Sequence, residues 1–177
     1  MHIGDAHMID QEGRMGETSL YDTDILAWTE EQAAALRALA GRPDLPNALD
    51  LPNVIEEIET LGRTELKAAT SPIRLILLHL LKVAFVPDSQ AEAHWRTEIV
   101  TWHGDVQDNM TISMHQRVDM DALWRRALRE AGAALRENGA ALPRTLPGEC
   151  PFGLEDFLGE TFDTDAAVAR LRALAAP

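Results

Sequence analysis

The stretch LPNVIEEIETLGRTELKAATSPIRLILLHLLKVAFV, residues 51–86, decides the fold of this chain. Its second half is apolar on almost every side of a helix, and a helix of that kind lies buried among other elements. Its first half is amphipathic, with apolar residues at helical spacing: Val54, Ile55, Ile58, Leu61 and Leu66. The stretch therefore predicts an all-α domain with a long central helix and the other helices packed against it.

Pro72 interrupts this stretch near its middle. A proline inside a helix removes one backbone hydrogen bond and kinks the helix. Either one long helix bends at Pro72, or two helices meet there and Ser71 caps the second. We favour the continuous, kinked helix. Pro52 suits the first turn, with Asp50 or Leu51 at the cap.

Apolar stripes predict three further main helices, over about residues 24–40, 89–115 and 119–138. Asp22 or Thr23 would cap the first of them. The rest of the chain predicts a proline-rich crossing segment and two short helices, the last capped within residues 163–165. The fold class is thus a bundle of four main helices in a single domain, residues 20–177. Residues 1–19 are predicted to form a disordered tail.

Composition argues against two classes of binding partner and indicates the cellular compartment. The 177 residues are 46% hydrophobic, which suffices for a full core. The net charge of −13 argues against nucleic acid and against anionic membrane surfaces as partners. No signal peptide and no uncharged apolar stretch of about 18 residues is present, so we expect no membrane association. The single cysteine forms no intrachain disulfide, and we expect a cytoplasmic protein.

The familiar catalytic motifs are missing from the sequence. It contains no P-loop, no G-x-G-x-x-G and no G-x-S-x-G. Cys150 has no histidine nearby in sequence, and the acidic neighbour Glu149 would raise the pKa of its thiol. We interpret Cys150 as a buried apolar residue.

A set of polar and aromatic residues on the central and third helices forms the candidate site. His79 and Lys82 lie three residues apart in the most apolar stretch, where an unpaired charge costs several kcal/mol. Glu98 on the third helix could pair with Lys82, and His94 shares a helix face with Glu98. The set either forms a buried polar network that fixes helix packing or holds a base whose pKa burial shifts. The candidate residues are Glu56, Glu57, His79, Lys82, His94 and Trp95.

A metal site is the alternative. Carboxylates and imidazoles that face inward between helices build the metal centres of helical bundles. Here the ligands would come from Glu56, Glu57 and the histidine set His79, His94 and His103. The sequence has neither a Glu-x-x-His pair nor a His-Glu-x-x-His motif, so the expectation is that no metal or other cofactor binds.

Four segments occur in an order that resembles a known family: NVIEEIETLGRTE, ILLHLLKVAFVP, HWRTEI and LPGECPFGLEDFL. The chain resembles the DUF29 family, helical bacterial proteins of unknown function. The resemblance implies an all-helical fold and names no activity. His94 stands where the family has serine, and most of the basic residues around that position are missing. The matching family positions are Glu56, Glu57, Gly62, Glu65, His79, Lys82 and Trp95.

Two functions follow as hypotheses. The first is a helical interaction or regulatory module without chemistry of its own, which binds a protein partner or forms a homo-oligomer. It predicts an exposed apolar patch. The alternative is a metal-dependent, hydrolase-like enzyme with its site between the central and third helices. It requires the convergence of at least three side chains from the set Glu56, Glu57, His79, His94 and His103.

Overall fold

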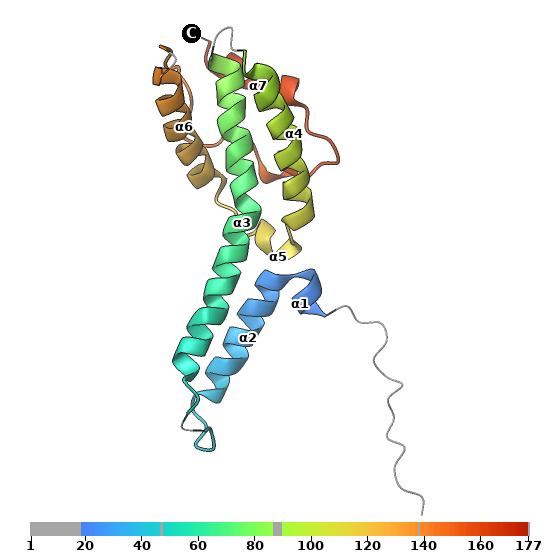
Figure 1. Cartoon of the computed structure of the whole chain (residues 1–177), viewed down its shortest axis with the longest axis vertical. Coiled ribbons are helices and arrows are strands. Elements are labelled where there is room, and N and C mark those ends of the chain that lie inside the picture. Colours follow the sequence, from blue (N-terminus) through green and yellow to red (C-terminus); the bar gives the residue numbers. More distant parts are fainter. Residues whose placement is uncertain (1–18, 47, 87–89, 138, 177) are drawn as a thin grey trace, which may run out of the picture.

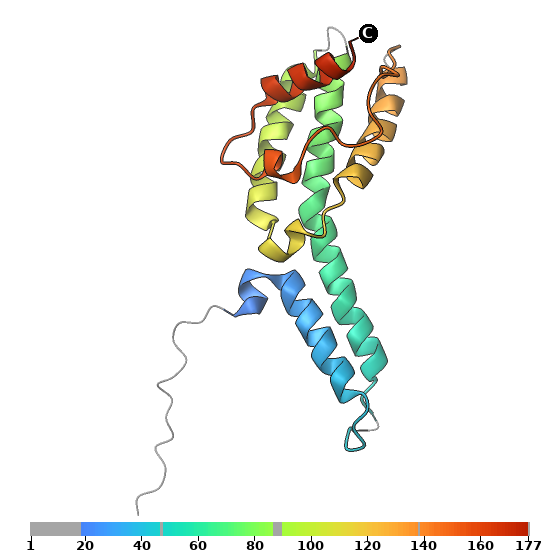
Figure 2. The same ribbon diagram turned by 180° about the vertical axis from the view of Figure 1, so that it is seen from behind.

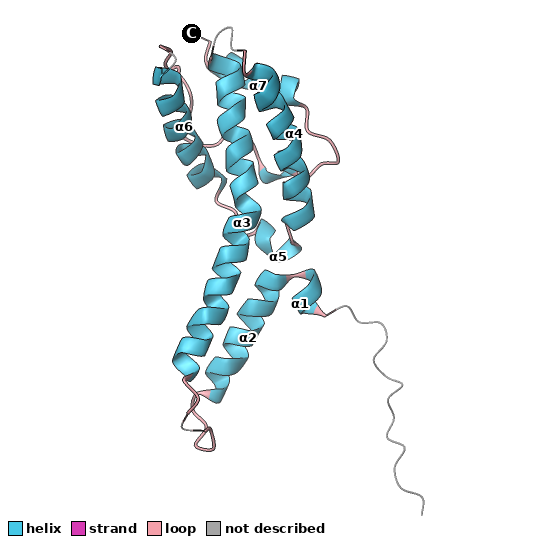
Figure 3. Ribbon diagram, in the orientation of Figure 1, coloured by secondary structure: helices cyan, strands magenta, loops and turns pink. Residues whose placement is uncertain are grey.

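The structure is a computed structural model that describes residues 19–46, 48–86, 90–137 and 139–176. Nearly all of the predicted tail lies outside these ranges. The described residues form helices and loops and contain no strand (Figure 3). The elements are α1 (Leu20–Thr23), α2 (Ile25–Leu39), α3 (Leu51–Phe85), α4 (Glu92–Asn109), α5 (Ile112–His115), α6 (Met120–Glu137), the 3-10 helix η1 (Leu154–Phe157) and α7 (Thr164–Leu174).

The central helix α3 organises two differently built halves of the molecule (Figures 1 and 2). It has 35 residues and is therefore about 52 Å long. Its C-terminal half packs against α4, α6 and α7, and we call this part the bundle. Its N-terminal half packs against α2 in an antiparallel hairpin, and we call residues 20–69 the arm. The all-α class and the long central helix are confirmed.

Pro72 bends α3 and does not break it. The helix is continuous through this buried proline, and Figure 1 shows a change of direction between its two halves. Ser71 is therefore not a helix cap. Its hydroxyl donates to the carbonyl of Lys67 at 2.7 Å, and the hydroxyl of Thr70 donates to the carbonyl of Leu66 at 2.8 Å. Asp50 caps α3 by accepting from the backbone N–H of Asn53.

The prediction of one helix over residues 89–115 is wrong. Helix α4 ends at Asn109, Met110 is extended, and α5 is a separate short helix. The reason is a tertiary contact with Asp24, which the local sequence does not contain. The Asp24 carboxylate accepts hydrogen bonds from Thr111 Oγ1 at 2.9 Å and from the Ser113 backbone N–H at 3.0 Å.

The main core lies in the bundle, around the apolar half of α3. Ile76, Leu77 and Leu80 are fully buried, together with Trp124 of α6 and Phe157 of η1. Helix α3 is long and apolar enough to cross a membrane by length and composition, and half of its most apolar window is buried inside the protein. The core helix of a globular bundle has the same signature, and the helices packed around α3 are those of such a bundle.

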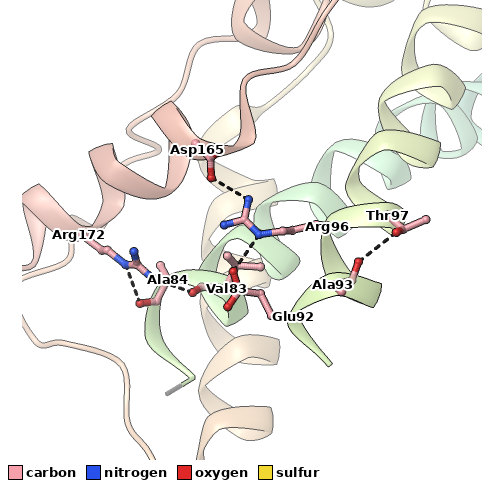
Figure 4. Close-up of polar contacts among 8 residues, drawn as sticks. All are labelled: Val83, Ala84, Glu92, Ala93, Arg96, Thr97, Asp165 and Arg172. Carbon is pink, nitrogen blue, oxygen red and sulfur yellow. Dashed lines mark hydrogen bonds and ion pairs between the residues drawn. The ribbon is translucent and has the colours of Figure 1, made fainter. Parts of the chain in front are cut away.

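Two arginines link α7 to the end of α3 and to the first turns of α4 by hydrogen bonds and an ion pair (Figure 4). Arg172 donates to the carbonyl oxygens of Val83 at 3.2 Å and Ala84 at 3.3 Å, which belong to the last turn of α3. A helix leaves its last four carbonyls without intrahelical donors, so Arg172 satisfies two of them. Arg96 of α4 pairs with Asp165 at 2.8 Å. Asp163 caps α7, within the predicted range.

Candidate functional site

A polar and aromatic cluster lies where α3 packs against α4. His79 of α3 is buried, with 6% of its surface exposed. Its imidazole meets the ring of Trp102 edge to face, with centroids 4.7 Å apart, and the ring of Trp95 at 6.4 Å. The Nζ atom of Lys82 lies 4.4 Å from the centre of the Trp95 ring, within the range of a cation–π contact. The two tryptophans thus enclose the polar side chains of α3.

Hydrogen bonds define the neutral form of His79. Its Nδ1–H donates to the carbonyl of Leu75 at 3.1 Å, so the lone pair of the neutral ring is on Nε2. Nε2 accepts from Nζ of Lys82 at 3.3 Å. Burial, and next the positive charge of Lys82, lower the pKa of His79. Burial also lowers the pKa of Lys82.

Glu98 of α4 provides a second partner for the same imidazole. Its Oε2 lies 3.0 Å from Nε2 of His79 and 3.5 Å from Nε2 of His94. Neutral His79 can accept from Lys82, whereas protonated His79 can donate to Glu98. Glu98 acts to raise the pKa of His79, but burial and Lys82 outweigh it. Neutral His79 therefore has both ring nitrogens engaged within the protein, which supports its interpretation as a packing element between α3 and α4.

The structure brings four of the six candidate residues together and leaves two apart. His79, Lys82, His94 and Trp95 meet at the α3–α4 contact. Glu56 and Glu57 are exposed on the arm, where Glu56 pairs with Arg63 at 2.7 Å. Their separation has a simple cause: six or more helical turns of α3 lie between them and His79, at 3.6 residues per turn.

The convergence that the metal hypothesis requires is not observed. His103 of α4 is buried elsewhere, with its ring 5.7 Å from that of Phe162, and its Nε2 has no hydrogen-bond partner among the described residues. Within the described ranges, no group of three or more His, Cys, Asp or Glu side chains is placed to hold a metal ion. The sequence places these residues on neighbouring helices, but their positions along the helices keep them apart.

Sequence reasoning missed two members of this cluster. Trp102 is not among the candidate residues, yet it makes the closest ring contact with His79. Its position seven residues after Trp95, two helical turns on the same face, is the signal that could have found it. The Leu75 carbonyl, four residues before His79, was also missed. Every residue has a backbone carbonyl, so the sequence does not indicate which carbonyl accepts a hydrogen bond from a side chain.

Cys150 lies outside this cluster, in the crossing segment. Burial raises the pKa of its thiol to about 11, so at neutral pH it is a protonated thiol. Its backbone N–H donates to the Asp121 carboxylate at 2.7 Å, and its side chain packs against the main core. Cys150 is thus an apolar contact of the core, but it is partly buried and not fully buried as the interpretation of the sequence has it.

Comparisons with known proteins give the relationship but no activity. The family model described as domain of unknown function DUF29 matches residues 20–163. A crystal structure of an alpha-helical protein of unknown function from Rhodospirillum rubrum is 43% identical and covers 88% of this chain and 99% of its own, with a TM-score of 0.75. No curated protein matches the chain. The matched region runs from α1 to the end of the crossing segment, and the chain belongs to the DUF29 family.

Proposed function

We propose that this protein is a helical interaction module that pairs with a second copy of itself through one face of the arm. The observation that carries the proposal is the exposure of large apolar side chains there. Seven such side chains are exposed in the described part of the chain, and four of them belong to the arm. These four are Tyr21, Leu49, Val54 and Leu61, at 55%, 43%, 37% and 37% exposure. Val54 and Leu61 belong to the face defined below, Tyr21 packs against Trp28 of that face, and Leu49 lies in the loop before α3.

Helical spacing places apolar residues of both arm helices on one side. The two helices touch where Gly62 of α3 meets Thr29 of α2. On one side of this contact line, each helix carries a stripe of apolar residues, because residues three or four apart lie on the same face of a helix. Because α2 and α3 are antiparallel, the two stripes fall on the same side of the arm. We call this set the apolar face: Trp28, Leu36 and Leu39 of α2, with Val54, Ile58 and Leu61 of α3.

The two helices of one arm leave the apolar face exposed to solvent. The four helices of two arms can bury it between them. An amphipathic helix needs a second layer over its apolar side, and a bundle of four helices is a common solution. The six residues of the apolar face are uncharged, although the chain carries a net charge of −13, and the polar Gln32 lies between Trp28 and Leu36 on α2. A charged partner would be matched by charges on the face. An uncharged apolar face suits a twofold contact between identical chains, which is the commonest symmetry of oligomers.

The size of the face sets the expected strength. Helix α2 has 15 residues and is about 22 Å long, and two packed helices are about 20 Å wide. The face is therefore roughly 400 Å² per copy, below the roughly 800 Å² per partner of a standard interface. We therefore expect a reversible dimer with a dissociation constant in the micromolar range.

Sedimentation equilibrium over a range of protein concentrations tests the proposal. The wild-type chain should sediment as a monomer–dimer equilibrium, and Leu61→Asp should sediment as a monomer. Val100→Asp is the matched control, because Val100 is 67% exposed on α4, outside the arm. A wild-type chain that remains monomeric at millimolar concentration, or an equal effect of the two variants, would refute the proposal.

The salt dependence of self-association distinguishes an apolar contact between two copies from a contact held by opposite charges. Two chains of charge −13 repel each other, so screening by salt should strengthen their association through the apolar face. We expect the dimer to tighten between about 0.05 M and about 0.5 M NaCl. Association that weakens over this range would indicate a contact held by opposite charges and would contradict the apolar dimer.

A further inference from the structure

A groove lies on the side of the arm opposite the apolar face. It has a volume of about 310 Å³ and runs between α2 and α3, with Arg117 from the segment after α5 at its edge. Its floor is apolar and is formed by Leu26, Ala33 and Leu66, together with Gly62. A Cβ atom at position 62 would lie 2.3 Å from Oγ1 of Thr29, so the glycine allows α2 and α3 to approach closely at the floor.

Three guanidinium groups from three parts of the chain surround this floor. Arg37 comes from α2, Arg63 from α3, and Arg117 from the segment that follows α5. The groove lining carries these three arginines against two glutamates, Glu30 and Glu59, whereas the whole chain has 29 acidic residues against 16 basic ones, so arginine is locally enriched at the groove. We call this site the arginine groove.

Each of the three arginines has a glutamate partner in the described structure. Arg37 pairs with Glu59, Arg63 with Glu56, and Arg117 with Glu30, the last two pairs at 2.7 Å. The arginine side chains remain 54%, 59% and 55% exposed. Exposed ion pairs contribute little free energy, and their carboxylates can turn to solvent. The glutamates therefore keep the arginine side chains at the groove, and an anionic ligand can replace them as partners of the arginines.

The chemistry of the site selects an anion with an apolar body. A guanidinium group binds a carboxylate, phosphate or sulfonate through two parallel hydrogen bonds, which a single glutamate oxygen does not satisfy. The apolar floor would cover a hydrocarbon or aromatic part of the ligand. A volume of about 310 Å³ is at the small end of ligand sites and suits a small molecule.

We propose that the arginine groove binds a small amphipathic organic anion, with its apolar body on Leu26, Ala33 and Leu66 and its charged group at Arg37, Arg63 and Arg117. This proposal is independent of dimerisation, because the groove and the apolar face lie on opposite sides of the arm. Occupation of the groove would link α2, α3 and the segment after α5.

Two fluorescent probes of nearly the same shape test this proposal on the full chain. One is 8-anilinonaphthalene-1-sulfonate, an apolar anion, and the other is its uncharged analogue N-phenyl-1-naphthylamine. The wild-type chain should bind the anion at one saturable site and bind the uncharged analogue more weakly. Arg63→Gln with Arg117→Gln should weaken the anion by about tenfold or more, because charge-assisted hydrogen bonds are lost. Binding of the uncharged analogue should not change.

Two variants serve as controls. Arg125→Gln removes an exposed arginine of α6 outside the groove and should leave anion binding unchanged. Leu61→Asp alters the apolar face and should also leave it unchanged, which separates the two sites. Thermal unfolding confirms that each variant is folded. Equal affinity of the wild type for both probes, or unchanged anion binding in the double arginine variant, would overturn the proposal.

Discussion

His79 of α3 and Glu98 of α4 approach to 3.0 Å between Nε2 and Oε2, although the pKa of His79 is lowered. The lowering arises first from burial and then from Lys82, whose ammonium group lies 3.3 Å from the same Nε2. Protonation of His79 would exchange its partner, from Lys82 as donor to Glu98 as acceptor. His94 of α4 contacts the same oxygen of Glu98 and is therefore the other titratable side chain at this position. We therefore expect the α3–α4 contact to depend on pH.

The first prediction concerns stability at low pH. The folded-state pKa of His79 lies below its ordinary value of 6.5, so below about pH 6.5 the unfolded chain binds the additional proton. The contribution of His79 to stability is therefore complete above pH 6.5 and decreases as the pH falls toward the folded pKa. Urea unfolding between pH 5 and pH 8 should show this decrease. His79→Gln should reduce it and cost about 1–2 kcal/mol at neutral pH, through a lost buried hydrogen bond.

His115→Gln is the control for this series, because His115 lies on α5, away from the α3–α4 contact. It should retain the pH dependence of the wild type. Parallel pH profiles for the wild type and His79→Gln would show that other groups cause the effect.

The second prediction concerns the close approach of the arm helices. In Gly62→Ala the new methyl group would lie 2.3 Å from Oγ1 of Thr29, and α2 and α3 would have to separate. We expect a loss of about 1–3 kcal/mol in the free energy of unfolding, in spite of the better helix propensity of alanine. Chemical denaturation measures this loss, and Thr29→Ala in the same chain should recover part of it.

Gly104→Ala provides a matched comparison on α4. A Cβ atom there meets nothing within 4 Å, so this substitution should stabilise the protein by about 0.5–1 kcal/mol through helix propensity alone. The same sign for the two glycine substitutions would contradict the steric explanation.

The third prediction concerns Asp24, which joins the arm to the bundle. Its carboxylate caps α2 by accepting from the N–H of Ala27, and it accepts hydrogen bonds from Thr111 and Ser113. Burial acts to raise the pKa of Asp24, but these hydrogen bonds outweigh it and lower the pKa. Asp24→Ala should cost about 2–3 kcal/mol, by loss of a helix cap and of partly buried hydrogen bonds.

The pH dependence of Asp24 has the same direction as that of His79, but it lies at lower pH. Its contribution is complete above the ordinary pKa of 3.8 and is lost as the pH falls through the lower, folded value. Acid unfolding of Asp24→Asn should be less steep than that of the wild type. Asp108→Ala, on the exposed surface of α4, should change neither stability nor this slope.

The fourth prediction concerns Arg172 at the C-terminal end of α3. Arg172→Ala leaves the carbonyls of Val83 and Ala84 without this donor, and we expect a cost of about 1 kcal/mol. Amide hydrogen exchange should rise in the last turn of α3 and in α7. Arg129→Ala, on the exposed side of α6, is the control and should leave both unchanged. Unchanged exchange in Arg172→Ala would mean that apolar packing alone holds α7.

Part of the candidate site was predictable because it depends on spacing along a single helix. His79 and Lys82 are three residues apart, and His94 and Glu98 are four apart, so each pair had to share a helix face. The need of a buried lysine for a partner predicted that Glu98 could pair with Lys82, and in the structure Glu98 contacts the neighbouring His79. Glu56 and Glu57 were grouped with them only because they are acidic and lie on the same helix, and the length of α3 separates them from the cluster.

The sequence by itself determined the helical class, the central position of α3 and the residues that fill its core, because these follow from the period and density of apolar side chains. It also determined that Pro72 lies within a helix, since strong helical patterns continue on both sides. Only the tertiary structure decided where α4 ends, because that depends on Asp24, 87 residues earlier than Thr111. It also decided that the arm has an apolar face and an arginine groove on opposite sides, since both depend on the packing of α2 against α3.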